Sequence, residues 1–345
     1  MKKSVLFICL ALFSIGMQAN KLNRTIVVTT PGTFGTYLTS TEKATVTDIV
    51  VTGKIDARDI KCMRDTLTAL ATVDLSAVNI QAYTGVGGTM TGTSVNYPAN
   101  EMPAYSFYNK NSSPRVSKVS LTSFIFPTSI TSIGDYAFFQ CSGLTGILSI
   151  PSSVTNIGNS VYQDCTGISG KLVLPNSLTT IQNCTFGWCS GLTELAIGSM
   201  VNAIESEAFT DCNSISKVSI ATVVPPTITS NSFGFYKSTC TLYVPIGSSA
   251  VYNNALYWQD FGQILEYNTS TGFQNLTENK VKIYNVKSVI VVEGTCKNEV
   301  ISIYSTNGKL ISSVKSNGHT ISIPIQKGIF CLVKTSHKCQ KLMTY

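Results

Sequence analysis

Between residues 126 and 212 the chain repeats one pattern of apolar and polar positions four times. Each copy starts at the end of an alternating apolar–polar–apolar triplet, passes through an isoleucine, and closes on an aromatic residue followed three positions later by cysteine. The closing cysteines stand 24, 24 and 23 residues apart, at Cys141, Cys165, Cys189 and Cys212. Self-similarity at a fixed period predicts a solenoid, in which each copy buries its apolar face against its neighbours.

Each alternating triplet predicts a short strand with one face in a core and the other in solvent. The five triplets are Leu148–Ile150, Leu172–Leu174, Leu195–Ile197, Val218–Ile220 and Leu242–Val244. The segment from the isoleucine to the cysteine is predicted to return the chain with a short helical turn. The first two copies carry one extra residue before the strand, near Gly146 and Gly170, which predicts a bulge. Stacking is expected to place isoleucine on isoleucine, aromatic on aromatic and cysteine on cysteine.

Eleven cysteines in an exported chain would ordinarily indicate disulfides. Equivalent cysteines on stacked copies lie near enough to bridge, but their Cα–Cβ bonds run parallel, which is the wrong geometry for a disulfide. We therefore expect a column of buried free thiols that act as small apolar side chains. A zinc site at Cys184 and Cys189 is a weaker alternative because no histidine lies in the repeats. No metal or cofactor is predicted.

The first 19 residues have the pattern of a secretory signal peptide. Lys2 and Lys3 precede the apolar run Val5–Ile15, and Ala19 offers a small residue before a cleavage point. No later stretch approaches the length of a transmembrane helix. The mature protein is therefore expected to be secreted or held at the cell surface.

Residues 20–99 are predicted to form a small α+β cap at the N-terminal end of the solenoid, which otherwise would expose its core. Asp56 can cap a helix that places Ile60, Met63 and Leu67 on one face. The Gly-, Thr- and Asn-rich stretch 84–100 is predicted to be a loop. The solenoid is expected to span 100–267, with Lys110 in the cysteine position of a divergent first copy, and a linker to span 268–278.

Residues 279–345 contain seven short apolar runs separated by turns, which predict a small antiparallel β-sandwich. Asn307-Gly308 and Asn317-Gly318 are strong hairpin signals. All of the net charge of +7 arises in this part of the chain, since 275–345 holds ten lysines and three glutamates. These lysines are scattered, which favours a solvated surface over a basic patch for anionic glycans or a membrane. No nucleic-acid partner is predicted.

The repeat pattern Leu-x-x-Ile-x-Ile-Pro-x-x-Val-x-x-Ile-Gly-x-x-Ala-Phe-x-x-Cys resembles the BspA-like leucine-rich repeats of bacterial surface proteins. This resemblance implies a mostly β solenoid of 23–24-residue leucine-rich repeats that binds proteins. The C-terminal runs Ile303–Ile311 and Gly328–Lys334 resemble the sorting domain of type IX secretion cargo. That second resemblance leaves two interpretations open, an active sorting signal or a structural module that spaces or attaches the repeats.

The side chains needed for common catalytic sites are missing from the sequence. The two histidines, His319 and His337, both fall in the C-terminal part, and neither has the partners of a catalytic triad. Glu205 and Glu207 could form a glycosidase pair, but they are two residues apart on a return segment and are expected to be solvated. The chain is therefore predicted to be a monomeric, non-catalytic protein.

The outward positions of the predicted strands form the candidate binding face. They are Ile125, Ser149, Val173, Ala196, Ser219 and Tyr243, flanked by Lys171, Glu194 and Lys217. The expected partner is a host or bacterial surface or matrix protein, which makes the chain adhesin-like. A glycan is the alternative partner, with Tyr243, Trp188, Tyr236 and Trp258 as candidate aromatic anchors, and a purely structural role is the third possibility. Trp188 is interpreted either as a surface anchor or as a space-filling residue.

Overall fold

The computed structural model describes residues 22–90, 92 and 94–267, together with seven strands between 282 and 343. The predicted signal peptide (1–19) and linker (268–278) lie outside these residues. The chain divides into two compact units, the first running to Leu265 apart from Pro245–Gly247, and the second containing the C-terminal strands. Each unit is described by itself.

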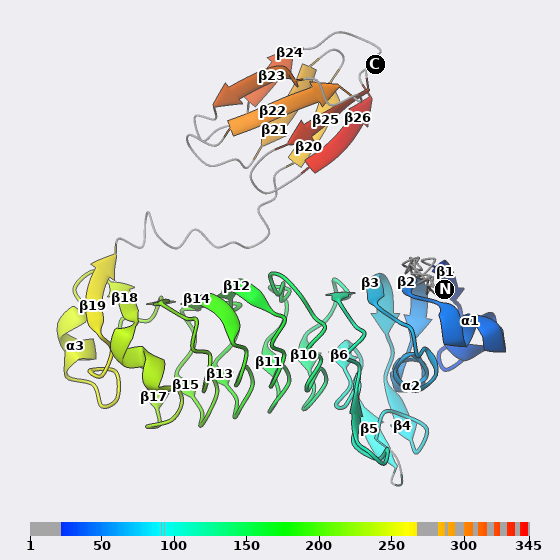
Figure 1. Ribbon diagram of the computed structural model, residues 1–345, viewed down its shortest axis with the longest axis horizontal. Coiled ribbons are helices and arrows are strands. Elements are labelled where there is room, and N and C mark those ends of the chain that lie inside the picture. Colours follow the sequence, from blue (N-terminus) through cyan, green and yellow to red (C-terminus); the bar gives the residue numbers. More distant parts are fainter. Residues whose placement is uncertain are drawn as a thin grey trace, which may run out of the picture. The chain divides into compact units, whose positions relative to one another are not determined.

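The N-terminal end of the first unit is a parallel four-stranded sheet with a helix against it (Figure 1). In sheet order its strands are β1 (Asn23–Val28), β2 (Asp48–Ile55), β3 (Thr72–Ile80) and β9 (Ser123–Ile125). Because β9 belongs to the first repeat, the cap and the repeats share one continuous sheet. The remaining elements are the 3₁₀ helix η1 (Phe34–Tyr37), α1 (Ser40–Thr45) and α2 (Ala57–Thr66).

The helix predicted after Asp56 is confirmed as α2. The Asp56 side chain accepts a hydrogen bond from the Arg58 backbone N–H at 2.9 Å, and the Asp59 carboxylate accepts one from the Asp56 N–H at 2.9 Å. This reciprocal capping satisfies backbone donors that have no partner inside the helix. Ile60, Met63 and Leu67 are fully buried, as their spacing predicted.

The predicted loop at 84–100 is in part a hairpin. Its strands are β4 (Tyr83–Gly85) and β5 (Val95–Tyr97), which pair antiparallel. The rings of Tyr83 and Tyr97 stack with centroids 5.9 Å apart. This cross-strand aromatic contact stabilises two strands whose Gly- and Thr-rich connection carries little strand propensity of its own.

Four of the five predicted repeat strands are confirmed as members of one sheet. In sheet order the strands are β12 (Ser169–Val173), β14 (Gly191–Ile197), β16 (Lys217–Ile220), β18 (Thr241–Pro245) and β19 (Gln263–Tyr267). The pairs from β12 to β18 are parallel. The predicted bulge is confirmed at Gly170, which has a φ of 78° and precedes a shift of register at Lys171.

The predicted strand Leu148–Ile150 is wrong. In the described part of the chain, no backbone hydrogen bond joins residues 147–150 to β9 or to β12. Gly146 enters this segment with a φ of 78°, outside the strand region. Beside it the rings of Phe124 and Phe126 pack edge-on against Phe138, at centroid distances of 5.0 and 5.7 Å. We attribute the missing strand to the backbone conformation of Gly146 and to the rings of Phe124 and Phe126. Edge-on rings need more lateral room than the leucines of later copies.

The return path of each repeat is a turn and a two-residue parallel strand, so the predicted helical turns are wrong for these copies. The two-residue strands form two ribbons. The first ribbon consists of β6 (Glu101–Met102), β10 (Ser132–Ile133) and β11 (Asn156–Ile157). The second ribbon consists of β13 (Thr180–Ile181), β15 (Ala203–Ile204) and β17 (Thr227–Ile228). Each turn contains two non-glycine residues with φ between 52° and 60°, namely Tyr136 and Gln140, Ser160 and Asp164, Cys184 and Trp188, and Glu207 and Asp211. A left-handed residue reverses the chain and prevents a helix from continuing. Helices follow only near the end of the described repeats, as η2 (Phe235–Thr239) and α3 (Ser249–Asn253).

The predicted columns of buried side chains are confirmed. An aromatic ladder is formed by Phe107, Phe138, Tyr162, Phe186, Phe209 and Phe233, with successive ring centroids 5.4–5.6 Å apart. The closing cysteines are buried and free, and we call them the cysteine column. The thiols of Cys165, Cys189 and Cys212 each donate to the carbonyl of a ladder residue in the preceding copy at 3.1 Å. The column therefore joins neighbouring copies by hydrogen bonds.

Lys110 does not take the role predicted for it in the cysteine position of the first copy, because an insert follows Phe107, the first residue of the aromatic ladder. Its ammonium lies 4.2 Å from the centre of the Tyr105 ring, whereas the buried lysine of this copy is Lys118. The Lys118 ammonium donates to the backbone carbonyls of Arg64 and Leu67, which lie at the end of α2. Lys118 follows directly on a short hairpin, whose strands are β7 (Tyr108–Asn109) and β8 (Val116–Ser117).

The described strands of the second unit pair antiparallel in two sheets. Sheet order is β20-β21-β24 in one and β23-β22-β25-β26 in the other. Their bounds are β20 (Lys282–Val286), β21 (Val289–Glu293), β22 (Val300–Ser305), β23 (Leu310–Lys315), β24 (Ile321–Pro324), β25 (Phe330–Lys334) and β26 (Cys339–Met343). The packing of these sheets as a sandwich stays a prediction.

Candidate functional site

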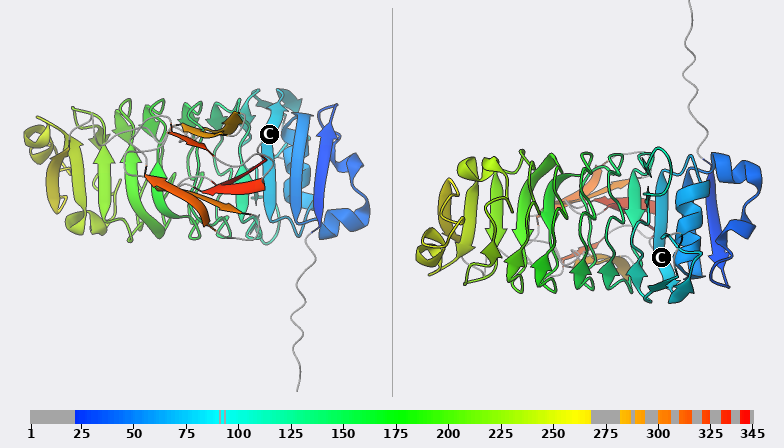
Figure 2. Two further views of the ribbon diagram at one scale, coloured as in Figure 1. Left: turned by 90° about the horizontal axis from the view of Figure 1, so that it is seen from above. Right: turned by 90° about the horizontal axis from the view of Figure 1, so that it is seen from below.

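The strands of the repeat sheet lie side by side along the solenoid (Figure 2). Their pairing brings most of the predicted face residues into two parallel rows across this sheet. The charged row consists of Lys171, Glu194 and Lys217, which are paired across β12, β14 and β16. The uncharged row runs beside it through Val173, Ala196, Ser219 and Tyr243. Ser149 is exposed but lies in the segment that fails to form a strand.

The two rows make a flat surface of mixed charge. Ala196 is only 3% exposed, and its neighbours in both rows are half-buried. Lysine and glutamate alternate along the charged row, so neighbouring charges attract. The Lys217 ammonium lies 5.0 Å from the centre of the Tyr243 ring, a cation–π distance that ties one row to the other.

A hollow interrupts the face between β9 and β12, where the predicted strand is missing. The central hollow has a volume of about 220 Å³, and its walls include Phe124, Phe126, Phe138, Leu148, Tyr162 and Ile168. At its rim Ile125 is 49% exposed and Ile147 is 75% exposed. The Tyr162 hydroxyl is buried, and none of the described residues forms a hydrogen bond with it. Sequence reasoning missed this hollow because the alternation at 148–150 predicts a strand that would fill it.

The face continues over the cap with the opposite charge. A groove of about 380 Å³ crosses the outer side of the cap sheet and is lined by residues that include Arg24, Asp48 and Asp74. Asp74 pairs with Ile125 across β3 and β9, so the groove reaches the rim of the central hollow. Asp48 accepts hydrogen bonds from the hydroxyls of Thr47 and Thr72. The face thus has a small excess of negative charge over the cap (Asp48 and Asp74 against Arg24), is apolar at the hollow and has a small excess of positive charge along the charged row.

Two of the predicted sugar anchors are wrong because they are core residues. Tyr236 is 7% exposed and Trp258 is 1% exposed. The Trp258 indole N–H donates to the Pro226 carbonyl at 2.8 Å, and its ring packs on Phe233 at 5.7 Å. It therefore closes the end of the aromatic ladder. Trp188 is half-buried in a turn, with a φ of 60°.

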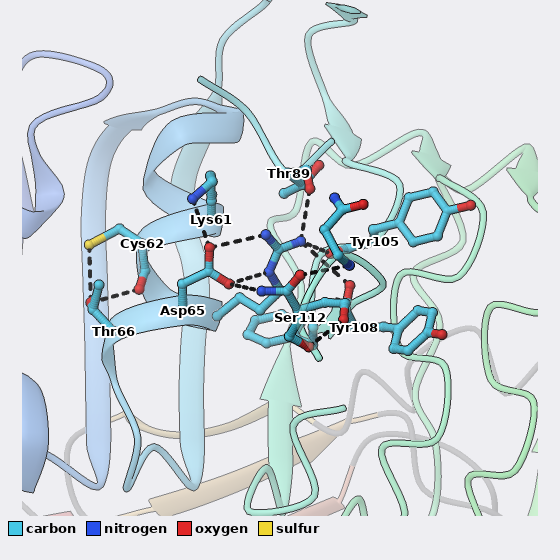
Figure 3. A network of polar contacts seen from close by, with 12 residues as sticks. Lys61, Cys62, Asp65, Thr66, Thr89, Tyr105, Tyr108 and Ser112 are labelled. Atoms are coloured by element: carbon cyan, nitrogen blue, oxygen red, sulfur yellow. Dashed lines mark hydrogen bonds and ion pairs between the residues drawn. The ribbon is translucent and has the colours of Figure 1, made fainter. Parts of the chain in front are cut away.

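A buried arginine links the cap helix to the first repeat (Figure 3). Arg64 is 6% exposed, and its guanidinium donates to the backbone carbonyls of Thr89 at 2.9 Å, Tyr105 at 2.8 Å and Tyr108 at 3.4 Å. Its charge is balanced by Asp65, whose carboxylate accepts from Arg64 at 2.7 Å. Burial opposes ionisation of Asp65, but hydrogen bonds from Arg64 and Lys61 outweigh it and lower the pKa of this carboxyl.

In 22–90, 94–267 and the C-terminal strands, no helix is long and apolar enough to span a membrane. Over the same residues, no three His, Cys, Asp or Glu side chains gather as they would around a metal ion.

Comparison with known proteins identifies the repeats. The sequence model of the BspA type leucine rich repeat region matches residues 100–240 and 158–280, with six copies, and these ranges together span more than half of the chain. No curated protein matches the chain.

Similar solved structures include three leucine-rich repeat proteins. The protein from T. pallidum is 16% identical over 55% of this chain and 67% of its own, with a TM-score of 0.30. The protein from Bacteroides ovatus is 13% identical over 66% of this chain and 68% of its own, with a TM-score of 0.30. The leucine rich cell surface protein from Faecalibacterium prausnitzii is 17% identical over 66% of this chain and 67% of its own, with a TM-score of 0.25.

Proposed function

Because the chain belongs to the BspA-type leucine-rich repeat family, we propose that it is a non-catalytic, adhesin-like protein that binds another protein through the outward face of its repeat sheet. The partner proposed is a surface or matrix protein of a host or of another bacterium. The protein acts as a monomer that is secreted or displayed on the cell surface.

The observation that carries this proposal is the central hollow with its exposed apolar rim. Protein interfaces draw most of their binding energy from a few large side chains buried in pockets, surrounded by contacts that exclude water. A volume of about 220 Å³ accommodates one large apolar side chain of a partner. Ile125 and Ile147 at the rim would be covered by the partner at the same time.

The charges on either side of the hollow give the proposed face a direction. Asp48 and Asp74 lie with Arg24 on the cap side, and Lys171 and Lys217 lie with Glu194 on the repeat side, so the net charge is −1 on one side and +1 on the other. A partner with a basic and an acidic segment flanking an apolar anchor fits this order in one orientation only. Complementary charge of this kind contributes mainly to specificity and to the association rate.

Two substitutions on the face test the proposal. Ile147→Glu puts a charge beside the hollow, and Lys171→Glu reverses one end of the charged row. Combined, they are expected to weaken binding to immobilised extracellular-matrix proteins at least about tenfold, since a central apolar anchor contributes more than about 1.4 kcal/mol. Biolayer interferometry on the full mature chain measures the change.

Val224→Glu is the matched control, because Val224 is 72% exposed but lies outside both rows. This variant should bind like the parent. Equal binding by the parent and the double variant would contradict the face assignment, and a parent that binds no matrix or surface protein would contradict protein binding itself.

The two ends of the chain have proposed roles in export. Residues 1–19 would be removed as a signal peptide, and the C-terminal strands would form the predicted sandwich. That sandwich would serve either as a type IX sorting domain or as a permanent spacer. The intact mass of protein recovered from the native host separates these roles, because a cleaved sorting domain would be missing and a spacer would be retained.

A further inference from the structure

Four aromatic side chains of the first two repeats lie outside the aromatic ladder, three of them on turns and the fourth on β7. They are Tyr105, Tyr108, Tyr136 and Phe139, and we call them the aromatic platform. The rings of Tyr105 and Tyr136 are nearly parallel, with centroids 5.2 Å apart and an angle of 8°. Tyr108 and Phe139 lie beside them, with centroids 4.7 Å apart. Tyr105, Tyr136 and Phe139 are half-buried, so part of the platform faces solvent.

The backbone under the platform is held from inside the protein. The Arg64 guanidinium donates to the carbonyls of both Tyr105 and Tyr108. Figure 3 labels these two tyrosines within the polar network. The Tyr105 N–H donates to the Asp135 carbonyl at 2.9 Å, which fixes the first turn against the second. A ligand that docks on side chains already fixed in this way loses little conformational entropy on binding.

The platform ends in a step. The Tyr136 N–H donates to the Asn159 carbonyl at 2.9 Å, so the third turn lies directly alongside the second. One repeat later, 24 residues along the chain, Tyr136 and Phe139 are replaced by Ser160 and Gln163. In the described part of the chain, no ring from the third turn packs against Tyr136 or Phe139. The rings of Tyr136 and Phe139 therefore have no aromatic neighbour on the side that faces the third turn.

Polar side chains rich in hydrogen-bond acceptors surround the step. The Asp135 carboxylate accepts from the Asn159 N–H at 2.7 Å, and the Gln140 amide donates to Asp164 at 3.5 Å. Gln140 is exposed and Asp164 is half-buried. Carboxylates and amides next to aromatic rings supply both kinds of contact that a sugar ring offers, a C–H face and a rim of hydroxyls.

We propose that the aromatic platform is a carbohydrate-binding site for uncharged glycans, separate from the protein-binding face. Tyr136 and Phe139 stack on the sugar ring, and Asp135, Gln140 and Asp164 accept or donate hydrogen bonds to its hydroxyls. The carboxylates of Asp135 and Asp164 disfavour sulfated and sialylated chains at the step, whereas Lys110, the lysine over the platform, lies on the Tyr105 ring. A proline-rich peptide also docks on aromatic surfaces, but it has few hydroxyl or N–H donors for the acceptors at the step.

The proposal predicts binding that depends on the two rings at the step. The full mature chain is titrated with soluble mannan, β-glucan, xylan and chitin oligosaccharides, and with heparin as the charged comparison. At least one uncharged glycan should bind, while heparin should not. Tyr136→Ala and Phe139→Ala are each expected to weaken that binding about tenfold or more, whereas Tyr136→Phe, which keeps the ring, should retain most of it.

Two further variants make the result specific. Phe235→Ala removes an aromatic ring that is 98% exposed elsewhere on the solenoid, and it should bind glycan like the parent. Ile147→Glu should also leave glycan binding unchanged, which separates this proposal from the protein-binding one. Thermal melting confirms that each variant is folded. The proposal is overturned by binding of no uncharged glycan, by binding that survives Tyr136→Ala, or by binding confined to heparin or to a proline-rich peptide probe.

Discussion

Raising the pH above about 9 is expected to destabilise the solenoid steeply. The thiols of the cysteine column are buried, and burial raises the pKa of Cys141 and Cys212 to about 12 and the pKa of Cys165 and Cys189 well above its usual range. In the unfolded chain the same thiols ionise near pH 9, so the unfolded state then holds fewer protons than the folded state. Stability is fully present below that pH and falls by about 1.4 kcal/mol per pH unit for each thiol, or about 5 kcal/mol per unit for four.

Urea unfolding followed by tryptophan fluorescence between pH 7.5 and 11 measures this loss, with a reductant present throughout. Both tryptophans, Trp188 and Trp258, lie in the first unit, so the signal reports on the solenoid alone. Lys118 works in the opposite direction. Burial lowers its pKa to about 8, so between about pH 8 and 10.5 its deprotonation favours the folded state and offsets one of the thiols.

A cysteine variant identifies the source of the pH dependence. Cys189→Ala should make the alkaline slope shallower by about 1.4 kcal/mol per pH unit, because one titrating group is removed. Cys62→Ala is the control, since Cys62 lies on α2 outside the column and is only half-buried. An unchanged slope in Cys189→Ala would show that the column does not cause the alkaline unfolding.

Phe186→Ala is expected to cost about 3–5 kcal/mol of unfolding free energy at neutral pH, as large-to-small core substitutions do. Phe186 is 1% exposed and stacks between Tyr162 at 5.5 Å and Phe209 at 5.6 Å. Its removal takes a contact from two neighbouring copies at once. The backbone around it is held by ladders of hydrogen bonds and cannot collapse to fill the space. The same urea titration measures the loss.

Two other aromatic variants show whether the lost stability comes from the stacked ring or from any substitution of an aromatic residue. Tyr162→Phe keeps the ring in the aromatic ladder and removes a buried hydroxyl that has no partner among the described residues, so stability should be unchanged or higher by about 1 kcal/mol. Phe235→Ala removes an exposed ring and should change stability by less than about 0.5 kcal/mol. If Phe186→Ala lost no more than Phe235→Ala, the stacked rings would not be a source of stability.

The sequence allows a good prediction of what the repeats bury. Residues that recur at the same step contact their own counterparts, so the cysteine column and the aromatic ladder follow from counting positions. The bulge at Gly170 follows in the same way, from one extra residue in a copy. The helix after Asp56 is predictable because its capping residues and its apolar spacing are local.

Features that depend on interactions between copies could not be predicted in this way. Leu148–Ile150 has the alternation of a strand, but the larger aromatic residues of the preceding copy occupy the space beside it. The aromatic platform is hidden because an insert separates Tyr105 from Tyr136 by 31 residues instead of 24. The shared spacing of Tyr105-x-x-Tyr108 and Tyr136-x-x-Phe139 was the available signal. The burial of Trp258 is hidden because it lies after the last clear copy of the repeat, where no counterpart in an earlier copy shows that its ring packs on Phe233.

The missing strand also divides the solenoid mechanically. The main sheet is interrupted between β9 and β12, and the return ribbons are interrupted between β11 and β13. Within the described residues, the turns still cross this second boundary, for example through the Tyr162 N–H and the Thr185 carbonyl at 2.8 Å. On the main-sheet side, the Ser169 N–H donates to the Gly146 carbonyl at 2.9 Å. A load that stretches the solenoid along its axis is therefore carried at this seam by this bridge, the turn hydrogen bonds and the stacked rings, so the blocks on either side can separate there while each keeps its own sheet.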